Sequence, residues 1–283
     1  MKTKQDTYKL HNGVEIPAIG YGTWQVDNDL SGVASIKDAL TAGYRHIDTA
    51  AAYDNEKSVG IAVRTSELDR KDIFVTSKLQ NSEHGYQETL AAFEKSMKRL
   101  GLAYLDLYLI HWPNPVKSRH NWQSANAGTW KAFEELYLAG RIRSIGVSNF
   151  RQHHLEALFA SARIMPMVNQ IRLCPGDTQD ETVEFSRKHG MVLEAYSPLG
   201  LGRVVEIPEL QEIAESHHKS VAQVSLRWSL QREFLPLPKS TSPVRIRENI
   251  DLYDFELSAA EMIRINNLRD CCGLSVDPDT ITF

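Results

Sequence analysis

Cysteine is scarce in this sequence, and no hydrophobic run is long. Of the 283 residues only 3 are cysteines, Cys174, Cys271 and Cys272, and their spacing matches neither a disulfide framework nor a zinc site. This usage is typical of a reducing environment, so we expect a cytoplasmic location. The first residues are polar and no later run could span a bilayer, so we expect neither secretion nor a membrane partner.

Proline-rich and strongly charged segments are also missing. The sequence has 11 prolines, 24% charged residues and a formal net charge of −4, so it contains no stretch typical of a disordered linker and little that would attract nucleic acid. It has 42% hydrophobic residues, which is enough for a large core. We therefore expect residues 1–283 to fold as a single domain.

Short apolar runs alternate with amphipathic segments along most of the chain. Helical spacing and a following glycine mark several amphipathic segments, for example those that end before Gly43 and Gly101. Such alternation is typical of parallel α/β folds, in which a helix connects each strand to the next. There are eight apolar runs, at residues 18–21, 44–47, 73–76, 105–110, 144–147, 167–171, 191–195 and 234–237.

Eight strand and helix units predict a closed (β/α)8 barrel, the TIM barrel. A β-hairpin over residues 8–16 would precede it, and an extra helix over residues 259–268 would lead into a tail over residues 273–283. We expect this tail to fold back over the barrel mouth. An open doubly wound sheet is the alternative, but its usual phosphate turn needs a third glycine that residues 20–25 lack.

Four ionisable residues follow successive predicted strands: Asp48, Tyr53, Lys78 and His111. Because the loops after the C-terminal strand ends form the site of a barrel, we expect these side chains to meet at one rim. A phenol has a pKa of about 10, so Tyr53 needs a nearby cation to donate a proton at neutral pH, and Lys78 can supply it. Asp48 would hold the Lys78 ammonium, and His111 would donate a hydrogen bond to a substrate oxygen.

Each of these residues also has an ordinary structural explanation. Asp48 could cap a strand end, and His111 could be a core histidine. Lys78 could be a solvated loop lysine, and Tyr53 could pack on the rim. Their succession at strand ends favours a proton-transfer site instead. Tyr53 and Lys57 also match the Tyr-x-x-x-Lys of short-chain dehydrogenases, but the Gly-rich dinucleotide turn of that class is missing.

A possible anion-binding segment follows the eighth predicted strand. Ser242 and Pro243 are typical of a helix N-cap and a first helical residue, so free N–H groups would face the preceding loop. Lys239, Ser240 and Arg245 surround this helix start and suit a phosphate monoester. A basic surface helix is the alternative, but phosphate sites after strands seven and eight recur in this fold.

The chain resembles the aldo-keto reductase family from Gly20 to the tail. This resemblance is carried by residues 43–50 with Tyr53, 76–79, 105–113, 144–150, 196–200 and 238–249. The short segment 200–208 resembles that of bacterial members such as 2,5-diketo-gluconate and methylglyoxal reductases. The resemblance implies NADPH as cofactor, a monomer, and reduction of a carbonyl by hydride transfer from nicotinamide C4. It also implies a catalytic tetrad, made of Asp48, Tyr53, Lys78 and His111.

The same resemblance assigns cofactor contacts across the barrel mouth. The nicotinamide would meet Ser148, Asn149 and Gln170, with Tyr196 stacked on its ring. Ser197 and Leu199 would contact the pyrophosphate. Cations at the 2′-phosphate favour NADPH over NADH, because a bare ribose hydroxyl does not need them. The predicted phosphate contacts are Lys239, Ser240 and Arg245, and the remaining predicted contacts are Gly22, Thr23 and, for the adenine, Glu248 and Asn249.

The substrate pocket is predicted from the same resemblance. Trp24 and Trp112 resemble the aromatic walls of the family's pocket, whereas Gln80 stands where a ring is common, so we expect these three to contact substrate in a more polar pocket. Arg172 and Cys174 stand where the family usually has Glu and His. Small aldehydes, dicarbonyls or keto-sugars are the expected substrates.

Two other functions stay open. A nicotinamide-sensing regulatory or structural protein on the same barrel would keep the tetrad without turnover. A metal-dependent barrel hydrolase would need histidine and carboxylate ligands from several strand ends. Only His111 and Asp48 are so placed, and we expect no metal.

Overall fold

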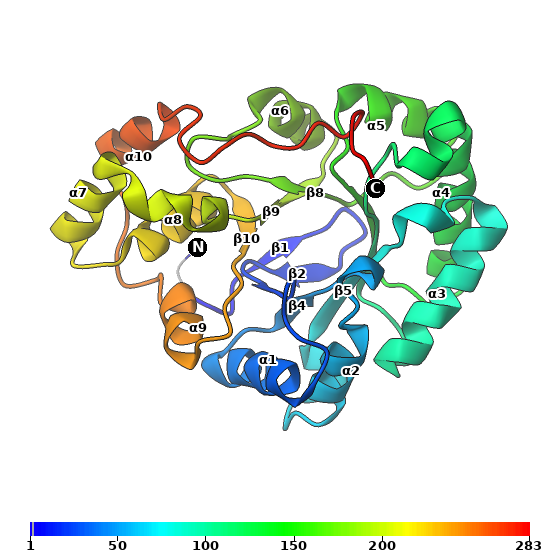
Figure 1. Cartoon of the computed structure of the whole chain (residues 1–283), viewed down its shortest axis with the longest axis horizontal. Coiled ribbons are helices and arrows are strands. Elements are labelled where there is room, and N and C mark those ends of the chain that lie inside the picture. Colours follow the sequence, from blue (N-terminus) through cyan, green and yellow to red (C-terminus); the bar gives the residue numbers. More distant parts are fainter. Residues whose placement is uncertain (2) are drawn as a thin grey trace.

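Parallel strands form the centre of the computed structural model, which describes Met1 and residues 3–283 (Figure 1). The 8-stranded sheet has the order β10-β9-β8-β7-β6-β5-β4-β3. The N–H groups of Gly20 and Gly22 donate to the carbonyls of Pro236 and Pro238, each at 3.0 Å, and so join the first strand to the last. The predicted closed barrel is confirmed. Its strands are β3 (Tyr21–Gly22), β4 (His46–Asp48), β5 (Phe74–Leu79), β6 (Leu107–Ile110), β7 (Ile145–Ser148), β8 (Val168–Arg172), β9 (Val192–Tyr196) and β10 (Phe234–Leu237).

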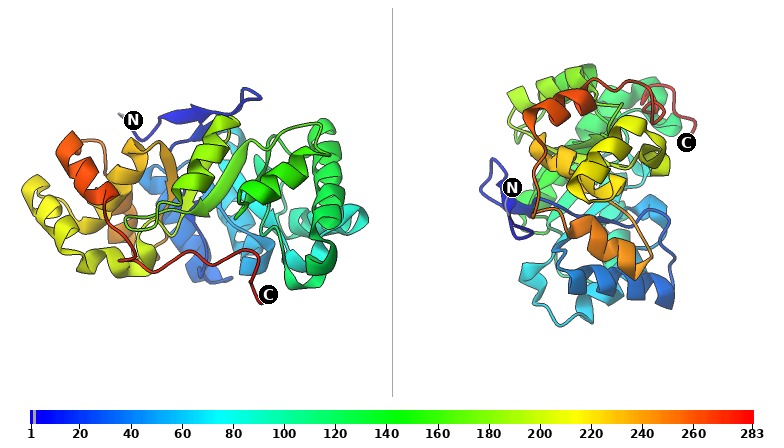
Figure 2. Two further views of the ribbon diagram at one scale, coloured as in Figure 1. Left: turned by 90° about the horizontal axis from the view of Figure 1, so that it is seen from above. Right: turned by 90° about the vertical axis from the view of Figure 1, so that its left-hand side faces the viewer.

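Helices surround the barrel on its outside (Figures 1 and 2). At the start of the first helix, Asp29 accepts hydrogen bonds from the N–H groups of Ser31 and Gly32. The same helix ends at Gly43, whose φ of 113° is left-handed, and the third ends at Gly101 with a φ of 62°, as predicted. The α-helices are α1 (Leu30–Ala42), α2 (Glu56–Arg64), α3 (Tyr86–Leu100), α4 (Trp122–Leu138), α5 (Gln152–Phe159), α6 (Asp180–Lys188), α7 (Pro208–His217), α8 (Val221–Gln231), α9 (Pro243–Ile250) and α10 (Ala259–Asn266).

The predicted strand bounds need small corrections. Ala18 donates its N–H to the Asp6 carbonyl at 2.9 Å, so the start of the first predicted run pairs with the N-terminal segment and β3 begins only at Tyr21. Leu105 forms an isolated bridge with Ile142, and β6 therefore begins at Leu107. Asp48 is the last residue of β4 rather than the first residue after it.

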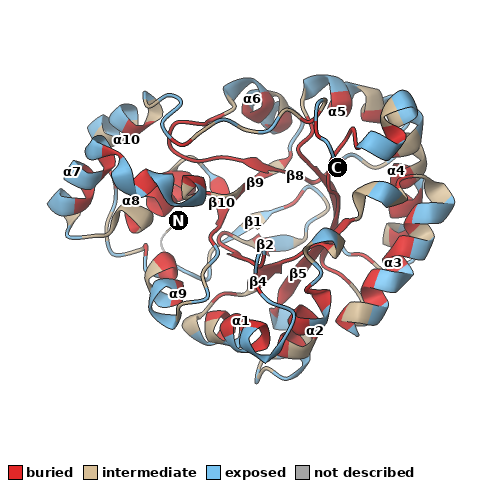
Figure 3. Ribbon diagram, viewed as in Figure 1, coloured by how far each residue is buried: buried red, intermediate tan, exposed pale blue. Residues whose placement is uncertain are grey.

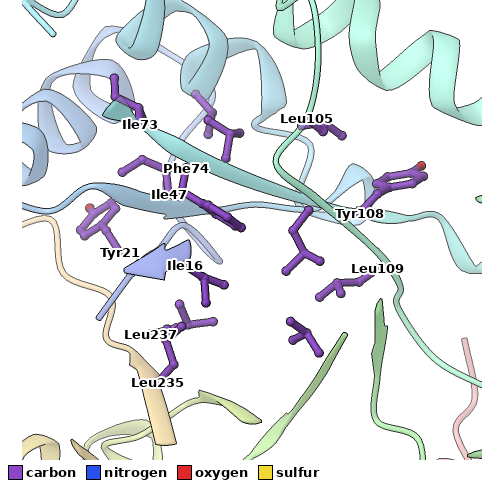
Figure 4. Packing of buried hydrophobic residues seen from close by; sticks show 14 of the residues in the cluster. Ile16, Tyr21, Ile47, Ile73, Phe74, Leu105, Tyr108, Leu109, Leu235 and Leu237 are labelled. Atoms are coloured by element: carbon purple, nitrogen blue, oxygen red, sulfur yellow. The ribbon is translucent and has the colours of Figure 1, made fainter. Parts of the chain in front are cut away.

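The predicted N-terminal hairpin closes one end of the barrel. Its strands are β1 (Thr7–Lys9) and β2 (Glu15–Pro17), and Gly13 in the turn has a φ of 89°. The fully buried Ile16 lies beside Leu235 and Leu237 of β10 (Figure 4). Burying such a side chain stabilises the fold by about 2 kcal/mol, so the hairpin is anchored by its inward face.

The C-terminal tail crosses the opposite end of the barrel (Figure 2). Arg172 at the end of β8 donates to the carbonyls of Cys272 at 2.6 Å and Gly273 at 2.8 Å. Farther along, the ring of Phe283 packs against Trp112 with centroids 5.4 Å apart. The predicted return of the tail over the barrel mouth is therefore confirmed.

Ionisable residues lie inside the barrel among apolar ones. The strands are largely buried, whereas the helices are exposed on their outer faces (Figure 3). Lys78 and Glu194 are 0% exposed and Asp48 is 3% exposed. Because a buried ionisable group needs a hydrogen-bond or ion-pair partner, we expect these residues to contact one another. Among the described helices, none combines the length and the apolar character needed to cross a membrane.

Candidate active site

Three neighbouring units of the barrel bring the predicted ionisable residues together. Asp48 ends β4, and Tyr53 ends the short 3-10 helix Ala51–Tyr53 that follows it. Lys78 lies near the end of β5, and His111 follows β6. The Lys78 ammonium donates to Asp48 Oδ1 at 2.6 Å and to Tyr53 Oη at 3.1 Å. The His111 ring lies edge-on to the Tyr53 ring, with centroids 5.7 Å apart.

Lys78 is held rigidly. Besides its contacts with Asp48 and Tyr53, it donates to the Thr49 carbonyl at 3.0 Å, so each ammonium hydrogen has an acceptor. Burial by itself would lower the pKa of Lys78, but the Asp48 carboxylate and Tyr53 act in the other direction, and the net pKa is raised. Lys78 is thus a buried cation at neutral pH and not a solvated loop lysine.

The phenol of Tyr53 is subject to opposing effects. Burial raises its pKa, the positive charge of Lys78 lowers it, and Asp48 and Glu194 raise it again. The predicted effect of Lys78 is present, but the net direction is upward because burial outweighs it. Tyr53 therefore carries its proton in the resting protein, as a proton donor must.

His111 is a neutral imidazole. Burial, and after it the positive charge of the Lys78 ammonium, holds its pKa well below the ordinary value. Its Nδ1 is buried and has no hydrogen-bond partner among the described residues. A neutral ring with an N–H at Nε2 could donate one hydrogen bond to an oxygen placed beside Tyr53 without adding charge.

The second carboxylate oxygen of Asp48 connects to two residues on β8 and β9. Gln170 Nε2 donates to Asp48 Oδ2 at 2.9 Å and to Glu194 Oε2 at 2.7 Å. We did not predict Glu194 as a site residue. A charged residue in the middle of the apolar run 191–195 is the signal that could have identified it, since such a residue must find a partner inside the barrel.

Four residues predicted at the nicotinamide form one hydrogen-bonded group. Ser148 Oγ donates to the Gln170 carbonyl at 2.8 Å, and Tyr196 Oη donates to Asn149 Oδ1 at 2.8 Å. The Asn149 amide donates to Ser148 Oγ at 3.1 Å and to the His111 carbonyl at 3.0 Å. Both amide hydrogens of Gln170 are used, whereas its Oε1 accepts no hydrogen bond from a described residue.

The predicted contacts at the start of the barrel have their polar groups engaged. The Gly22 N–H donates to Pro238, as described above, and Thr23 is fully buried with its N–H and its hydroxyl both directed to the Asp48 carbonyl. The buried Asn55, another residue that we did not predict, donates to the Thr23 carbonyl at 2.7 Å. Thr23 thus has no free donor to offer a ligand.

The residues predicted to bind an anion lie around the start of α9. Pro243 is the first helical residue and Ser242 the N-cap, as predicted, but the Ser242 side chain caps no N–H group. Instead Ser240 Oγ accepts from the Ser242 N–H at 3.1 Å. Lys239 and Arg245 are exposed and make no ion pair with any residue that the structure describes. Two free cations therefore flank uncapped N–H groups.

The remaining predicted contacts lie around the same mouth. Trp112 is 8% exposed and packs under the tail, Trp24 is 47% exposed, and Gln80 is half-buried at the start of the loop after β5. The other predicted cofactor residues follow β9 or belong to α9: Ser197, Leu199, Glu248 and Asn249.

One cluster of described residues has ligand types that could hold a metal ion: His153, His154 and Asp279, with ligand atoms within 4.8 Å of one another. His154 Nδ1 accepts the Arg151 N–H at 3.2 Å, so its proton is on Nε2, which lies 3.0 Å from Asp279 Oδ1. A protonated nitrogen does not bind a metal. This cluster fastens the tail to α5.

Comparisons with known proteins identify the family. A sequence model of the aldo/keto reductase family matches residues 18–270 of the chain. The chain is 49% identical over 279 residues to glyoxal reductase of Bacillus subtilis (strain 168), covering 99% of this chain and 98% of that protein. A solved aldo/keto reductase from Brucella melitensis is 48% identical with a TM-score of 0.88, covering 94% of this chain and 98% of that one. The Bombyx mori aldo-keto reductase, solved in complex with NADP, is 34% identical with a TM-score of 0.86, covering 95% and 94%. The chain belongs to the aldo/keto reductase family.

Proposed function

We propose that this protein is an NADPH-dependent reductase of aldehydes, dicarbonyls or keto-sugars, with Tyr53 as general acid. The observation that carries the proposal is the fixed Lys78 ammonium, 3.1 Å from Tyr53 Oη and 2.6 Å from Asp48 Oδ1, inside a barrel mouth. A buried cation beside a protonated phenol is suited to stabilise the phenolate that proton donation leaves behind.

The residues present fit the cofactor. Gln170 Oε1 lacks a donor, and the amide group of a nicotinamide carboxamide would supply one. At the other end, the unpaired Lys239 and Arg245 beside the uncapped start of α9 suit a phosphate monoester. When bound, NADPH supplies a hydride from C4 of its nicotinamide ring. The Bombyx mori relative was solved with NADP.

The side chains of this chain then handle the proton. Tyr53 Oη gives its proton to the carbonyl oxygen as the carbonyl carbon accepts the hydride, so that an alcohol forms. His111 donates a hydrogen bond to the same oxygen and orients it. Lys78 stabilises the Tyr53 phenolate, and Asp48 keeps the Lys78 ammonium in place and charged.

The substrate class is proposed from the pocket and from one relative. Trp24 and Trp112 supply apolar surface, and Gln80 adds a polar group on the rim. The glyoxal reductase of Bacillus subtilis, at 49% identity, acts on a small dicarbonyl according to its name.

We also propose that the chain forms a single domain, is a monomer and lies in the cytoplasm. The proposed location rests on the scarcity of cysteine.

Tyr53→Phe tests the assigned role. We expect turnover with glyoxal and NADPH to fall by roughly 10²–10⁴-fold while NADPH affinity is nearly kept, because only the general acid is lost. Tyr108→Phe is the matched control, since the buried Tyr108 hydroxyl has no hydrogen-bond partner among the described residues. Unchanged turnover in Tyr53→Phe would refute the role of Tyr53.

A carbonyl panel assayed with NADPH and with NADH tests the function as a whole. Oxidation of NADPH by at least one aldehyde, dicarbonyl or keto-sugar is the expected result. Binding of NADPH without turnover of any carbonyl would instead support a nicotinamide-sensing protein.

A further inference from the structure

A second buried carboxyl lies beside the proposed catalytic residues. Glu194 on β9 is 0% exposed, and its Oε2 accepts a hydrogen bond from Gln170 Nε2 at 2.7 Å. The same nitrogen donates to Asp48 Oδ2 at 2.9 Å. The Lys78 ammonium in turn donates hydrogen bonds to Asp48 Oδ1 and to Tyr53 Oη. A continuous series of hydrogen bonds therefore runs from Glu194 to the Tyr53 phenol.

Among the residues that the structure describes, those facing Glu194 supply one positive charge. From β4 come Asp48 and His46, whose Nε2 lies 3.7 Å from Glu194 Oε1, and from β5 comes Lys78. Burial and the charge of Lys78 lower the pKa of His46 to about 3, so this ring is neutral. The neighbouring strand β8 contributes the uncharged Gln170, and β10 on the other side contributes only apolar side chains.

One cation cannot neutralise two buried carboxylates. Asp48 contacts the Lys78 ammonium directly, whereas Glu194 reaches it only through Gln170. The Oε1 atom of Glu194 is buried and accepts no hydrogen bond from any described residue, which a charged carboxylate would require. Glu194 is therefore the carboxyl that keeps a proton. Burial, followed by the charge of Asp48, raises its pKa to about 8.

We propose that Glu194 is a positioning residue that fixes Asp48 and Lys78 through Gln170 and that, by losing its proton in alkaline solution, restrains proton donation by Tyr53. The inference rests on the proposed reductase function. The Gln170 amide bridges both carboxyls, so a change of charge on Glu194 acts on Asp48 as well as on Tyr53. Ionised Glu194 raises the pKa of Tyr53, and a weaker acid protonates the substrate oxygen less readily.

The pH profile of reduction tests this proposal. Between about pH 6 and pH 10, we expect kcat/KM of the wild-type protein to fall about 3- to 10-fold in a step near pH 8, before Tyr53 itself ionises. In Glu194→Gln that step should be missing, because the amide keeps the shape and cannot ionise. A step of the same size in Glu194→Gln would overturn the proposal.

Glu56→Gln is the matched control. Glu56 is buried like Glu194, with 1% of its surface exposed. It accepts hydrogen bonds from Ser77 Oγ at 2.5 Å and from Arg99 Nε at 2.6 Å, and no described hydrogen bond joins it to Asp48. It should keep the step near pH 8. Loss of the step in both variants would contradict a specific effect of Glu194.

Infrared spectroscopy decides the question without any activity. The carbonyl band of a protonated buried carboxyl should be present in the wild-type protein at neutral pH, disappear with a midpoint near pH 8, and be absent in Glu194→Gln. A wild-type spectrum without this titration would overturn the proposal, even if Glu194→Gln fails to fold. A missing activity with every carbonyl, but with the band present, would instead refute the reductase function alone.

Discussion

Replacing Asp48 by Asn should destabilise the protein far more than an ordinary loss of an ion pair. The substitution keeps the size of the side chain but removes its charge. Lys78 is 0% exposed, so its ammonium would then be buried with only the Thr49 carbonyl, the Tyr53 hydroxyl and the new amide oxygen as partners. Removing one partner of a buried pair typically costs about 3–5 kcal/mol, and we expect a loss of this size at pH 7.

The loss should depend on pH in a defined direction. In the wild-type protein the pKa of Lys78 is raised on folding, so its stabilising contribution is present below the unfolded pKa and is lost as pH rises through the folded pKa. In Asp48→Asn, burial acts without the opposing carboxylate and lowers the pKa of Lys78. The variant therefore gains stability with rising pH, and its deficit should shrink toward about pH 10.

Urea unfolding followed by tryptophan fluorescence measures both effects. Asp69→Asn is the control, because Asp69 pairs with Lys71 at 3.6 Å with both side chains at least 74% exposed. Such an exposed pair contributes less than about 1 kcal/mol. Equal losses for Asp48→Asn and Asp69→Asn at pH 7, or a deficit that grows toward alkaline pH, would refute the reasoning.

Three further predictions follow from the same structure. In fluorescence titrations, Lys239→Ala should weaken NADPH binding by about 1.5–3 kcal/mol and NADH binding little, and substitution of the exposed Arg247 by Ala is the control. Equal losses for both nucleotides would reject a contact between Lys239 and the phosphate. Glu194→Gln should raise the free energy of unfolding at pH 9 by roughly 3–5 kcal/mol and change it little at pH 4, because the wild-type protein loses stability as pH rises from the unfolded pKa of Glu194, 4.5, to its folded pKa of about 8. A gain that is the same at both pH values would contradict this. Phe283→Ala should raise KM for an aromatic aldehyde about 3- to 10-fold with kcat nearly kept, because the Phe283 ring packs against the Trp112 ring with centroids 5.4 Å apart. An unchanged KM would show that this packing does not position Trp112 for substrate.

Much of the fold could be predicted because each strand is a local pattern. The apolar runs, Gly43 and Gly101 each report on a few neighbouring residues, and these expectations were confirmed. The start of β3 could not be predicted, because Ala18 pairs with the distant N-terminal segment. The sequence also predicted that Asp48, Tyr53, Lys78 and His111 share one rim, since parallel strands place their C-terminal ends together.

Other features depend on contacts between strands and could not be predicted. Gln170 stays a predicted contact of the nicotinamide, and the structure adds that its amide hydrogens join Asp48 and Glu194, which no local pattern indicates. The upward net shift in the pKa of Tyr53 also arises from burial in the closed barrel.

By itself, the sequence determined which residues can do acid and base chemistry and at which strand ends they lie, because both properties are local. The tertiary structure alone decided which of them keep a proton. That depends on how much water each group loses and which charges from other strands come near it, and barrel closure sets both.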